Sequence, residues 1–176
     1  MVIVSYIASF VATVLGLIEP FGKNMKTIFI FNFSGNFLVG LSYFFVEEPA
    51  LTGALICCVA CCQVIINFAF ETKKKPLPMW LIILHAVAFT AVNLLVFAAW
   101  YDVLALLASL LFVLSLAQTN ASNYRIYYFL NSGLWIVYDF LAKAYGNLFT
   151  HGALFIATLI AIFIRDRKNK NKTISA

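Results

Sequence analysis

The sequence predicts an all-α membrane protein with seven transmembrane helices, arranged as three helices, one linking helix and three further helices. The chain of 176 residues is 64% hydrophobic and only 11% charged, which leaves too few polar side chains to cover a soluble domain. A stretch near the start, residues 28–39, is also similar to residues 126–137. Both stretches carry a Ser-Gly pair and follow a basic residue, Lys26 or Arg125. These observations predict a lipid-embedded bundle built from two related halves.

Seven apolar runs divide the chain. Most are close to the ~20 residues that cross ~30 Å of hydrocarbon, and each should be helical because lipid offers backbone polar groups no partner. The first and fifth runs are short, so we expect little tilt or a locally thinner bilayer there. The runs cover residues 2–18, 27–46, 50–70, 77–99, 103–117, 124–142 and 148–164.

Short polar or proline-containing segments separate these runs. The first run lacks a basic leading segment and a small-residue cleavage site before Glu19-Pro20, so we interpret it as a spanning helix rather than a signal peptide. Glu47-Glu48-Pro49 separates the second and third runs, and Trp100-Tyr101-Asp102 precedes the fifth. Pro76 and Pro78 open the fourth run, where a missing N–H costs little.

Basic residues fall almost entirely on one side of this arrangement. Seven crossings place eleven of the twelve Lys and Arg residues on one side, and Lys143 on the other with Glu47, Glu48 and Asp102. Because cytoplasmic loops carry the excess of Lys and Arg, we expect the N-terminus outside and the C-terminus in the cytoplasm. The eleven are Lys23, Lys26, Lys73, Lys74, Lys75, Arg125, Arg165, Arg167, Lys168, Lys170 and Lys172.

The internal similarity extends beyond the two central stretches. Gly53-Ala54-Leu55 recurs as Gly152-Ala153-Leu154. Four crossings separate equivalent helices, so both copies face the same way and the repeat axis follows the membrane normal. The predicted organisation is a first three-helix bundle at 1–72, a linker helix at 73–100, a second three-helix bundle at 101–165 and a basic cytoplasmic tail at 166–176.

Polar and aromatic side chains form a stripe on the sixth predicted helix, and two amides lie four residues apart on the second. Polar groups in hydrocarbon turn inward, towards partner groups or a wet cavity. One hypothesis is a midplane site that binds a small solute through amides and a stacking Trp. The other is that these side chains only hold helices together. The candidate substrate-binding residues are Asn32, Asn36, Tyr128, Asn131, Trp135 and Tyr138, and Tyr124 and Asp139 complete the stripe.

Two titratable residues inside predicted helices are candidates for a gate or for proton coupling. Asp139 lies about one turn from the outer end, four residues before Lys143, so a paired acid at the rim is the alternative. His85 lies in the linker helix, where a packed histidine is the alternative to a proton relay.

The remaining chemistry-bearing residues give little support for an enzyme. Cys57, Cys58, Cys61 and Cys62 stand on one apolar helix without carboxylates, a pattern that favours packing over metal or redox chemistry. The chain has no nucleophile–base–acid set, phosphate loop or zincin motif. We therefore expect no enzyme activity, no cofactor and no metal. The net charge of +5 belongs to loops and tail, so we expect the lipid bilayer rather than nucleic acid as partner.

The chain resembles the YgjV family of small bacterial inner-membrane proteins over nearly its full length. The similarity rests on the basic residues before the second and sixth helices, the Trp135-x-x-Tyr138-Asp139 segment, Tyr145-Gly146-Asn147 and Gly152. The family often has His-Asn where this chain has Tyr138-Asp139. The resemblance implies location in the inner membrane and a multi-pass architecture.

The three-one-three plan is also similar to that of the SWEET and PQ-loop transporters. Their Pro-Gln signature is missing, since Glu19-Pro20 and Ala117-Gln118 stand near the equivalent places. This architectural resemblance implies a small-solute transporter or facilitator with a midplane cavity between the two repeats. The alternative is a membrane sensor or scaffold that transports nothing. The sequence leaves the oligomeric state open, a homodimer included.

Overall fold

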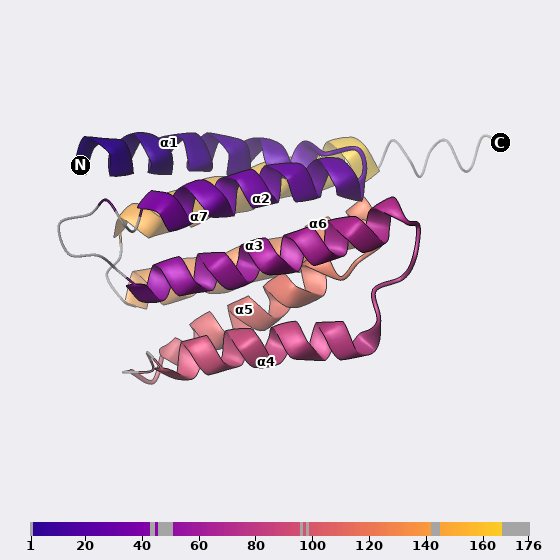
Figure 1. The fold of residues 1–176 in the computed structure, drawn as a ribbon. Helices are drawn as coiled ribbons and strands as arrows, with labels where there is room; N and C mark the ends of the chain where they lie inside the picture. Colours follow the sequence, from indigo (N-terminus) through magenta and orange to yellow (C-terminus); the bar gives the residue numbers. More distant parts are fainter. Residues whose placement is uncertain are drawn as a thin grey trace.

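A computed structural model of the chain describes residues 2–42, 45, 51–95, 97, 99–141 and 145–166. Within these ranges the chain forms seven α-helices and two short helical turns (Figure 1). They are α1 (Val2–Ile18), η1 (Glu19–Phe21), α2 (Met25–Ser42), α3 (Leu51–Thr72), α4 (Met79–Leu95), α5 (Asp102–Leu116), α6 (Ala121–Leu141), α7 (Tyr145–Ala161) and η2 (Ile162–Asp166).

Each predicted apolar run contains one of these helices, and the differences lie at the ends. Helix α4 begins directly after Pro78, whose carbonyl accepts a hydrogen bond from the Leu81 amide at 3.0 Å. Helix α6 begins three residues earlier than hydropathy indicates. The Asn120 side chain accepts a hydrogen bond from the Ser122 amide at 2.8 Å, and its carbonyl accepts one from the Tyr124 amide. Polar capping therefore extends this helix past the apolar run.

The helices pack in a closed order, and α4 lies outside it. Helix α1 contacts α2, α2 contacts α3, α3 contacts α5, α5 contacts α6, α6 contacts α7, and α7 returns to α1. Helix α4 packs on α5 and α3, where Phe89 contacts Phe112 edge to face with ring centroids 5.9 Å apart. Helices α2 and α6 share an apolar core with α3 and α5, formed by Met25, Ile28, Phe29, Val64, Leu116, Tyr124 and Tyr128.

A glycine brings α2 and α3 close together, but it is not one of those singled out in the sequence. A Cβ added at Gly40 would lie 2.9 Å from the Cβ of Cys57. At Gly35 the nearest atom would be the Ala12 carbonyl oxygen at 3.8 Å, and at Gly133 a Phe155 ring carbon at 3.5 Å. Both distances are ordinary van der Waals contacts, so a Cβ would fit at Gly35 and at Gly133.

The outer surface of the bundle is apolar. Ile3, Tyr6 and Phe10 on α1 are each more than 70% exposed, and large exposed apolar side chains also occur on the other six helices. Such a surface is foreign to a soluble monomer and typical of lipid contact. By length and hydropathy, Ala54–Thr72 and Leu148–Asp166 can each cross a membrane, and Tyr6–Phe21, Met79–Leu95 and Asp102–Leu116 are shorter apolar helices.

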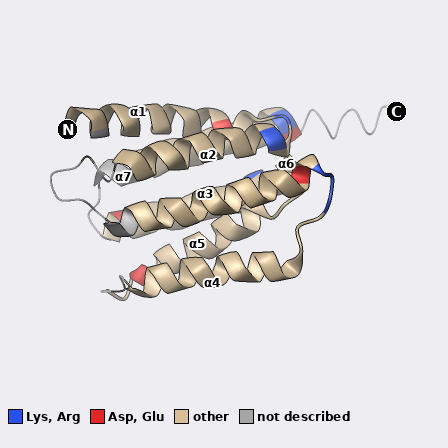
Figure 2. Cartoon of the chain, viewed as in Figure 1, with Lys and Arg blue, Asp and Glu red and all other residues tan. Residues whose placement is uncertain are grey.

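Charge separates the two ends of the bundle (Figure 2). The described Lys and Arg residues gather where α1, α3 and η2 end, and we call this the basic end. They are Lys23, Lys26, Lys73, Lys74, Lys75, Arg125 and Arg165. The opposite end, where α1 begins and α6 ends, carries Asp102 and Asp139 and is called the far end. Lys143, Glu47 and Glu48 lie outside the described residues.

Candidate functional site

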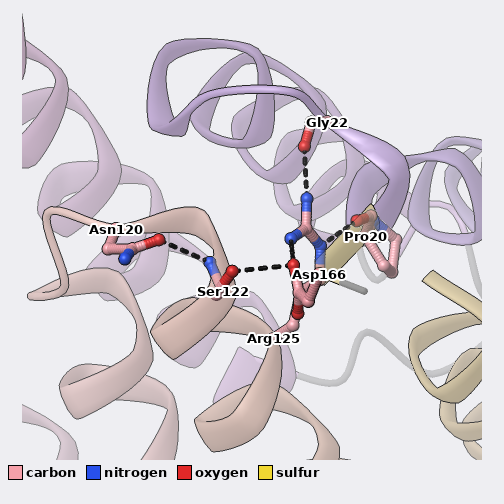
Figure 3. Close-up of polar contacts among 6 residues, drawn as sticks. All are labelled: Pro20, Gly22, Asn120, Ser122, Arg125 and Asp166. Atoms are coloured by element: carbon pink, nitrogen blue, oxygen red, sulfur yellow. Dashed lines mark hydrogen bonds and ion pairs between the residues drawn. The ribbon is translucent and has the colours of Figure 1, made fainter. Parts of the chain in front are cut away.

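Arg125 ties three segments together at the basic end (Figure 3). Its side chain is 2% exposed. The Nε group donates to the Pro20 carbonyl and the Nη2 group to the Gly22 carbonyl, both at 2.7 Å. Its Nη1 group forms an ion pair with Asp166 at 2.5 Å. We call this set of contacts the Arg125 junction.

The junction joins the beginning of the chain to its second half. The turn after α1 supplies the two carbonyls, α6 supplies Arg125, and η2 supplies Asp166. Ser122 adds a bond from its hydroxyl to the same Asp166 oxygen at 2.7 Å. A planar guanidinium with donors in a fixed fork suits several acceptors at once, which a lysine cannot reproduce. The guanidinium therefore holds the basic end closed around it.

A second polar group, the Glu19 cluster, lies beside the junction and contains Glu19, Asn32, Asn36 and Tyr124. One oxygen of Glu19 accepts hydrogen bonds from the Asn32 amide at 2.8 Å and from the Tyr124 hydroxyl. The Asn36 amide donates to the Asn32 side-chain oxygen at 3.0 Å. The ring of Tyr124 stacks on that of Tyr128 with centroids 5.3 Å apart. The cluster therefore connects η1 and α2 to α6.

The carboxyl group of Glu19 is buried, and no cation in the described part of the chain pairs with it. Glu19 is 3% exposed, and its partners Asn32 and Tyr124 are neutral. Neither ion pair among the described residues includes it. Glu19 lies in the turn between α1 and α2. Burial raises its pKa to about 7, because desolvation outweighs the hydrogen bonds from Tyr124 and Asn32 that favour the charged form.

A third polar group, the His151 cluster, lies at the far end. Asp139 on α6 contacts the Nδ1 atom of His151 on α7 at 2.6 Å, and its side chain is 1% exposed. The indole of Trp135 stacks on the His151 ring with centroids 5.4 Å apart, and Tyr138 meets Trp135 edge to face. Asp139 thus has a partner on the neighbouring helix. The pairing predicted with Lys143 falls outside the described residues.

Asn131 lies between the two polar clusters and bonds to a helix backbone. Its amide donates to the Ala108 carbonyl of α5 at 2.7 Å, and the residue is 5% exposed. This contact joins α6 to α5, as the interpretation of Asn131 as a helix-holding residue requires. Asn32 and Asn36 lie on α2 in the Glu19 cluster, so the candidate residues fall into separate groups.

Burial changes along the predicted stripe. Tyr124, Tyr128 and Asn131 are buried, whereas Trp135 and Tyr138, nearer the far end, are only partly buried. On α2, Asn32 is buried and Asn36 partly buried. The stripe is therefore buried towards the basic end and partly exposed at Asn36, Trp135 and Tyr138, and it is buried again at Asp139.

His85 is separated from these clusters by its helix. It is 4% exposed in α4, which packs on α5 and α3 outside the closed order of helices. Two amides of α3 also bond to the backbone of α5. Gln63 reaches the Val113 carbonyl at 3.3 Å, and Asn67 reaches the Leu116 carbonyl at 2.8 Å. These residues hold helices together around the candidate site.

The structure has a hollow on α4 and another near the end of α5, and no residue of α6 lines either. One, of about 380 Å³, is an apolar hollow along α4 between Ile83 and Leu94. The other, of about 20 Å³, lies between α3 and the end of α5 near Asn67 and Leu116. The predicted site residues line neither hollow.

The cysteines and acids show no metal centre in the part of the chain that the structure describes. No group of three or more His, Cys, Asp or Glu side chains there is placed to hold an ion. The four cysteines are free thiols, and Cys57 is buried where α3 meets Gly40.

Sequence reasoning missed three residues of these clusters. Glu19 reads as a loop acid because it follows an apolar run and precedes a proline. Arg125 reads as one of the loop bases, and His151 as an isolated rim residue. One signal was available for Arg125, since it precedes the stripe directly and its neighbour Tyr124 belongs to that stripe. Which partners these side chains meet depends on contacts across about 100 residues of chain, such as that of Tyr124 with Glu19, 105 residues apart.

Comparison with known proteins identifies one family. A family model, Imp-YgjV, described as bacterial inner membrane protein, matches residues 3–170 of the chain. No curated protein and no solved structure matches the chain.

Proposed function

Because the chain belongs to the YgjV family of bacterial inner membrane proteins, we propose that it crosses this membrane seven times and moves a small polar solute. The N-terminus lies outside and the C-terminus in the cytoplasm, so the basic end is the cytoplasmic end. The passage runs between α2 and α6, the inner helices of two three-helix repeats. In the described conformation it is closed at the cytoplasmic end by the Arg125 junction.

The order of helix contacts supports the two repeats. If α1, α2 and α3 are exchanged for α5, α6 and α7, the contacts α1–α2 and α2–α3 become α5–α6 and α6–α7. The contact α3–α5 becomes α7–α1, which also occurs. The same exchange pairs Ser34-Gly35 with Ser132-Gly133. Helix α4 then serves as the linker that gives both repeats the same orientation.

The partial exposure of Asn36, Trp135 and Tyr138, beyond the buried part of the stripe, is the observation that carries the proposal. Polar residues that only hold helices together have no reason to become accessible towards one end, whereas a passage closed at one end does. Asn36, Trp135 and Tyr138 are the residues that an entering solute meets first. Amides supply hydrogen bonds, and the faces of Trp135 and Tyr138 suit the apolar side of a sugar, polyol or amino acid.

Shrinkage of proteoliposomes, followed by light scattering after mixing with glycerol, glycine or sucrose, tests this function. We expect faster re-swelling with at least one of these solutes than in protein-free vesicles. Trp135→Ala and Asn36→Leu should abolish the difference, because both remove contacts in the accessible part of the stripe. Phe140→Ala, on the exposed face of α6, is the matched control and should leave the rate unchanged.

A specific observation also favours the alternative of a sensor or scaffold. The amide of Asn131 is occupied by the Ala108 carbonyl and that of Asn32 by Glu19, as expected of helix-holding groups. A sensor or scaffold predicts that vesicles with and without the protein re-swell at the same rate for all three solutes. It also predicts no labelling of single cysteines at positions 36 and 135 by a water-soluble maleimide, after Cys57, Cys58, Cys61 and Cys62 have been replaced.

A further inference from the structure

The Glu19 cluster contains a carboxyl group that no role above requires. The side chain is 3% exposed at the contact between the two proposed halves, with η1 on one side and α6 on the other. An ionised carboxylate in such a place is costly unless it is paired. The nearby guanidinium makes its hydrogen bonds to the Pro20 and Gly22 carbonyls and to Asp166 rather than to Glu19.

Among the residues that the structure describes, the charged and titratable groups around Glu19 leave the carboxyl without a counter-charge. Helix α6 presents the hydroxyl of Tyr124, with Tyr128 stacked behind it and Arg125 held in the junction. Helix α2 presents the neutral Asn32, and its one described base, Lys26, is partly exposed. In η2, Asp166 pairs with Arg125, next to Arg165. On α1 and α7, Tyr6 and His151 belong to the turns nearer the far end.

We propose that Glu19 is a proton-binding site that loads while the basic end is closed and discharges when it opens. In the closed form the carboxylate takes a proton from water and becomes a neutral carboxylic acid. Opening separates η1 from α6, water reaches the group, and the hydrated carboxylate returns the proton to the cytoplasmic side. One proton is taken up and one released in each cycle, so no other reactant is needed.

The same chemistry links the proton to the contact between the halves. A charged carboxylate accepts the hydrogen bond of Tyr124 about twice as strongly as a neutral one. Desolvation outweighs this preference, so the closed form binds the proton more tightly than the open form does. Protonation therefore favours the closed form, and loss of the proton favours separation of η1 from α6. This consequence rests on the proposed function: if a solute enters from the far end, it is accompanied by a proton.

Infrared spectra of the full-length protein in lipid bilayers, recorded from pH 5 to 9, test the site without any solute. We expect a protonated-carboxyl band that disappears with a midpoint near the pKa of about 7. Glu19→Gln should remove this band, and the control Glu71→Gln should retain it. Tyr124→Phe should raise the midpoint, because it deletes a hydrogen bond to the charged form. Arg125→Lys should lower it, because a loosened junction admits water.

Two results would overturn the proposal. One is a titrating band that persists in Glu19→Gln, and the other is a Glu19 carboxyl that stays ionised over the whole pH range. Tyr124→Phe keeps the test decisive if Glu19→Gln does not fold, because an unmoved midpoint also rejects Glu19 as the titrating group. Failure of glycerol, glycine and sucrose to enter proteoliposomes would remove the transport function but would leave these spectra to decide the proton site.

Discussion

Arg125 illustrates how a single side chain acquires a role that its sequence context hides. In the sequence it is one of the bases that determine the expected orientation. In the folded chain it is buried and serves two backbone carbonyls and a carboxylate. Those carbonyls follow α1, where a helix end leaves acceptors without partners inside the helix. The guanidinium satisfies acceptors that the lipid could not.

Replacement of Arg125 tests this account. Arg125→Ala leaves Asp166 without its ion-pair partner and the Pro20 and Gly22 carbonyls without donors, so we expect a loss of about 3–5 kcal/mol in the free energy of unfolding. Arg125→Lys should lose less stability, because an ammonium keeps the positive charge but cannot donate to all three acceptors as the planar guanidinium does. Thermal unfolding in detergent measures both, and Lys23→Ala at an exposed position is the control. Equal stability of Arg125→Ala and the unsubstituted protein would show that the junction contributes nothing.

Glu19 makes stability depend on pH in a direction unusual for an acid. Its pKa of about 7 lies above the ordinary value of 4.5 for a glutamate, so between these two values the folded protein holds a proton that the unfolded chain releases. Stability is then greatest below 4.5 and falls as the pH rises towards 7. We expect the melting temperature in detergent to fall over this range. Glu19→Gln should reduce that slope, and a slope of unchanged size would assign the effect to other groups.

At the scale of the elements, α2 and α3 depend on a small residue for their contact. The Cβ of an alanine at position 40 would lie 2.9 Å from the Cβ of Cys57. Membrane helices gain much of their association from close backbone approach, since lipid gives apolar side chains no reason to leave it. Cys57 therefore packs as a small apolar residue. This agrees with its place on an apolar helix that lacks carboxylates.

Two alanine substitutions separate packing from helix propensity. Gly40→Ala should destabilise the protein by about 1–3 kcal/mol, because the helices must move apart. Gly152→Ala meets no atom within 4 Å and should change stability by no more than about 1 kcal/mol, in the stabilising direction. Thermal unfolding in the same detergent compares them. A neutral Gly40→Ala would mean that α2 and α3 have room to adjust.

At the scale of the whole molecule, the two ends differ in charge and in burial. The described bases gather at the end where α3 and η2 finish, whereas acids occur at both ends. The partly buried aromatic residues Trp135 and Tyr138 lie towards the far end. Seven helices carry the chain from one end of the bundle to the other (Figure 1). By the positive-inside rule, we expect the basic end on the cytoplasmic side.

Reporter fusions test this orientation. Alkaline phosphatase is active only outside the inner membrane, so it should be active when inserted after Glu48 and inactive when inserted after Lys74. A fluorescent protein fused after the last residue should fluoresce, because the C-terminus is expected in the cytoplasm. Phosphatase activity at both insertion points would contradict seven crossings. The opposite pattern would reverse the orientation and place the Arg125 junction outside.

The sequence alone determined the class of the protein, its helices and the gathering of charge at one end. These follow from composition and from the spacing of apolar runs, because lipid forces each run to satisfy its own backbone as a helix. Family membership, expected from motifs such as Trp135-x-x-Tyr138-Asp139, is confirmed over residues 3–170. The roles of Asn32, Asn131 and Trp135 in binding a solute stay predictions, as do the repeat and the domain limits.

Only the tertiary structure decided which polar groups meet. Nothing near Glu19 in the chain indicates that it lies against Tyr124, and nothing near Asp139 indicates that it contacts His151. A helical period states which face of one helix is polar, but not which residue of another helix faces it. That choice depends on helix order, rotation and depth, which packing of the complete bundle sets at once.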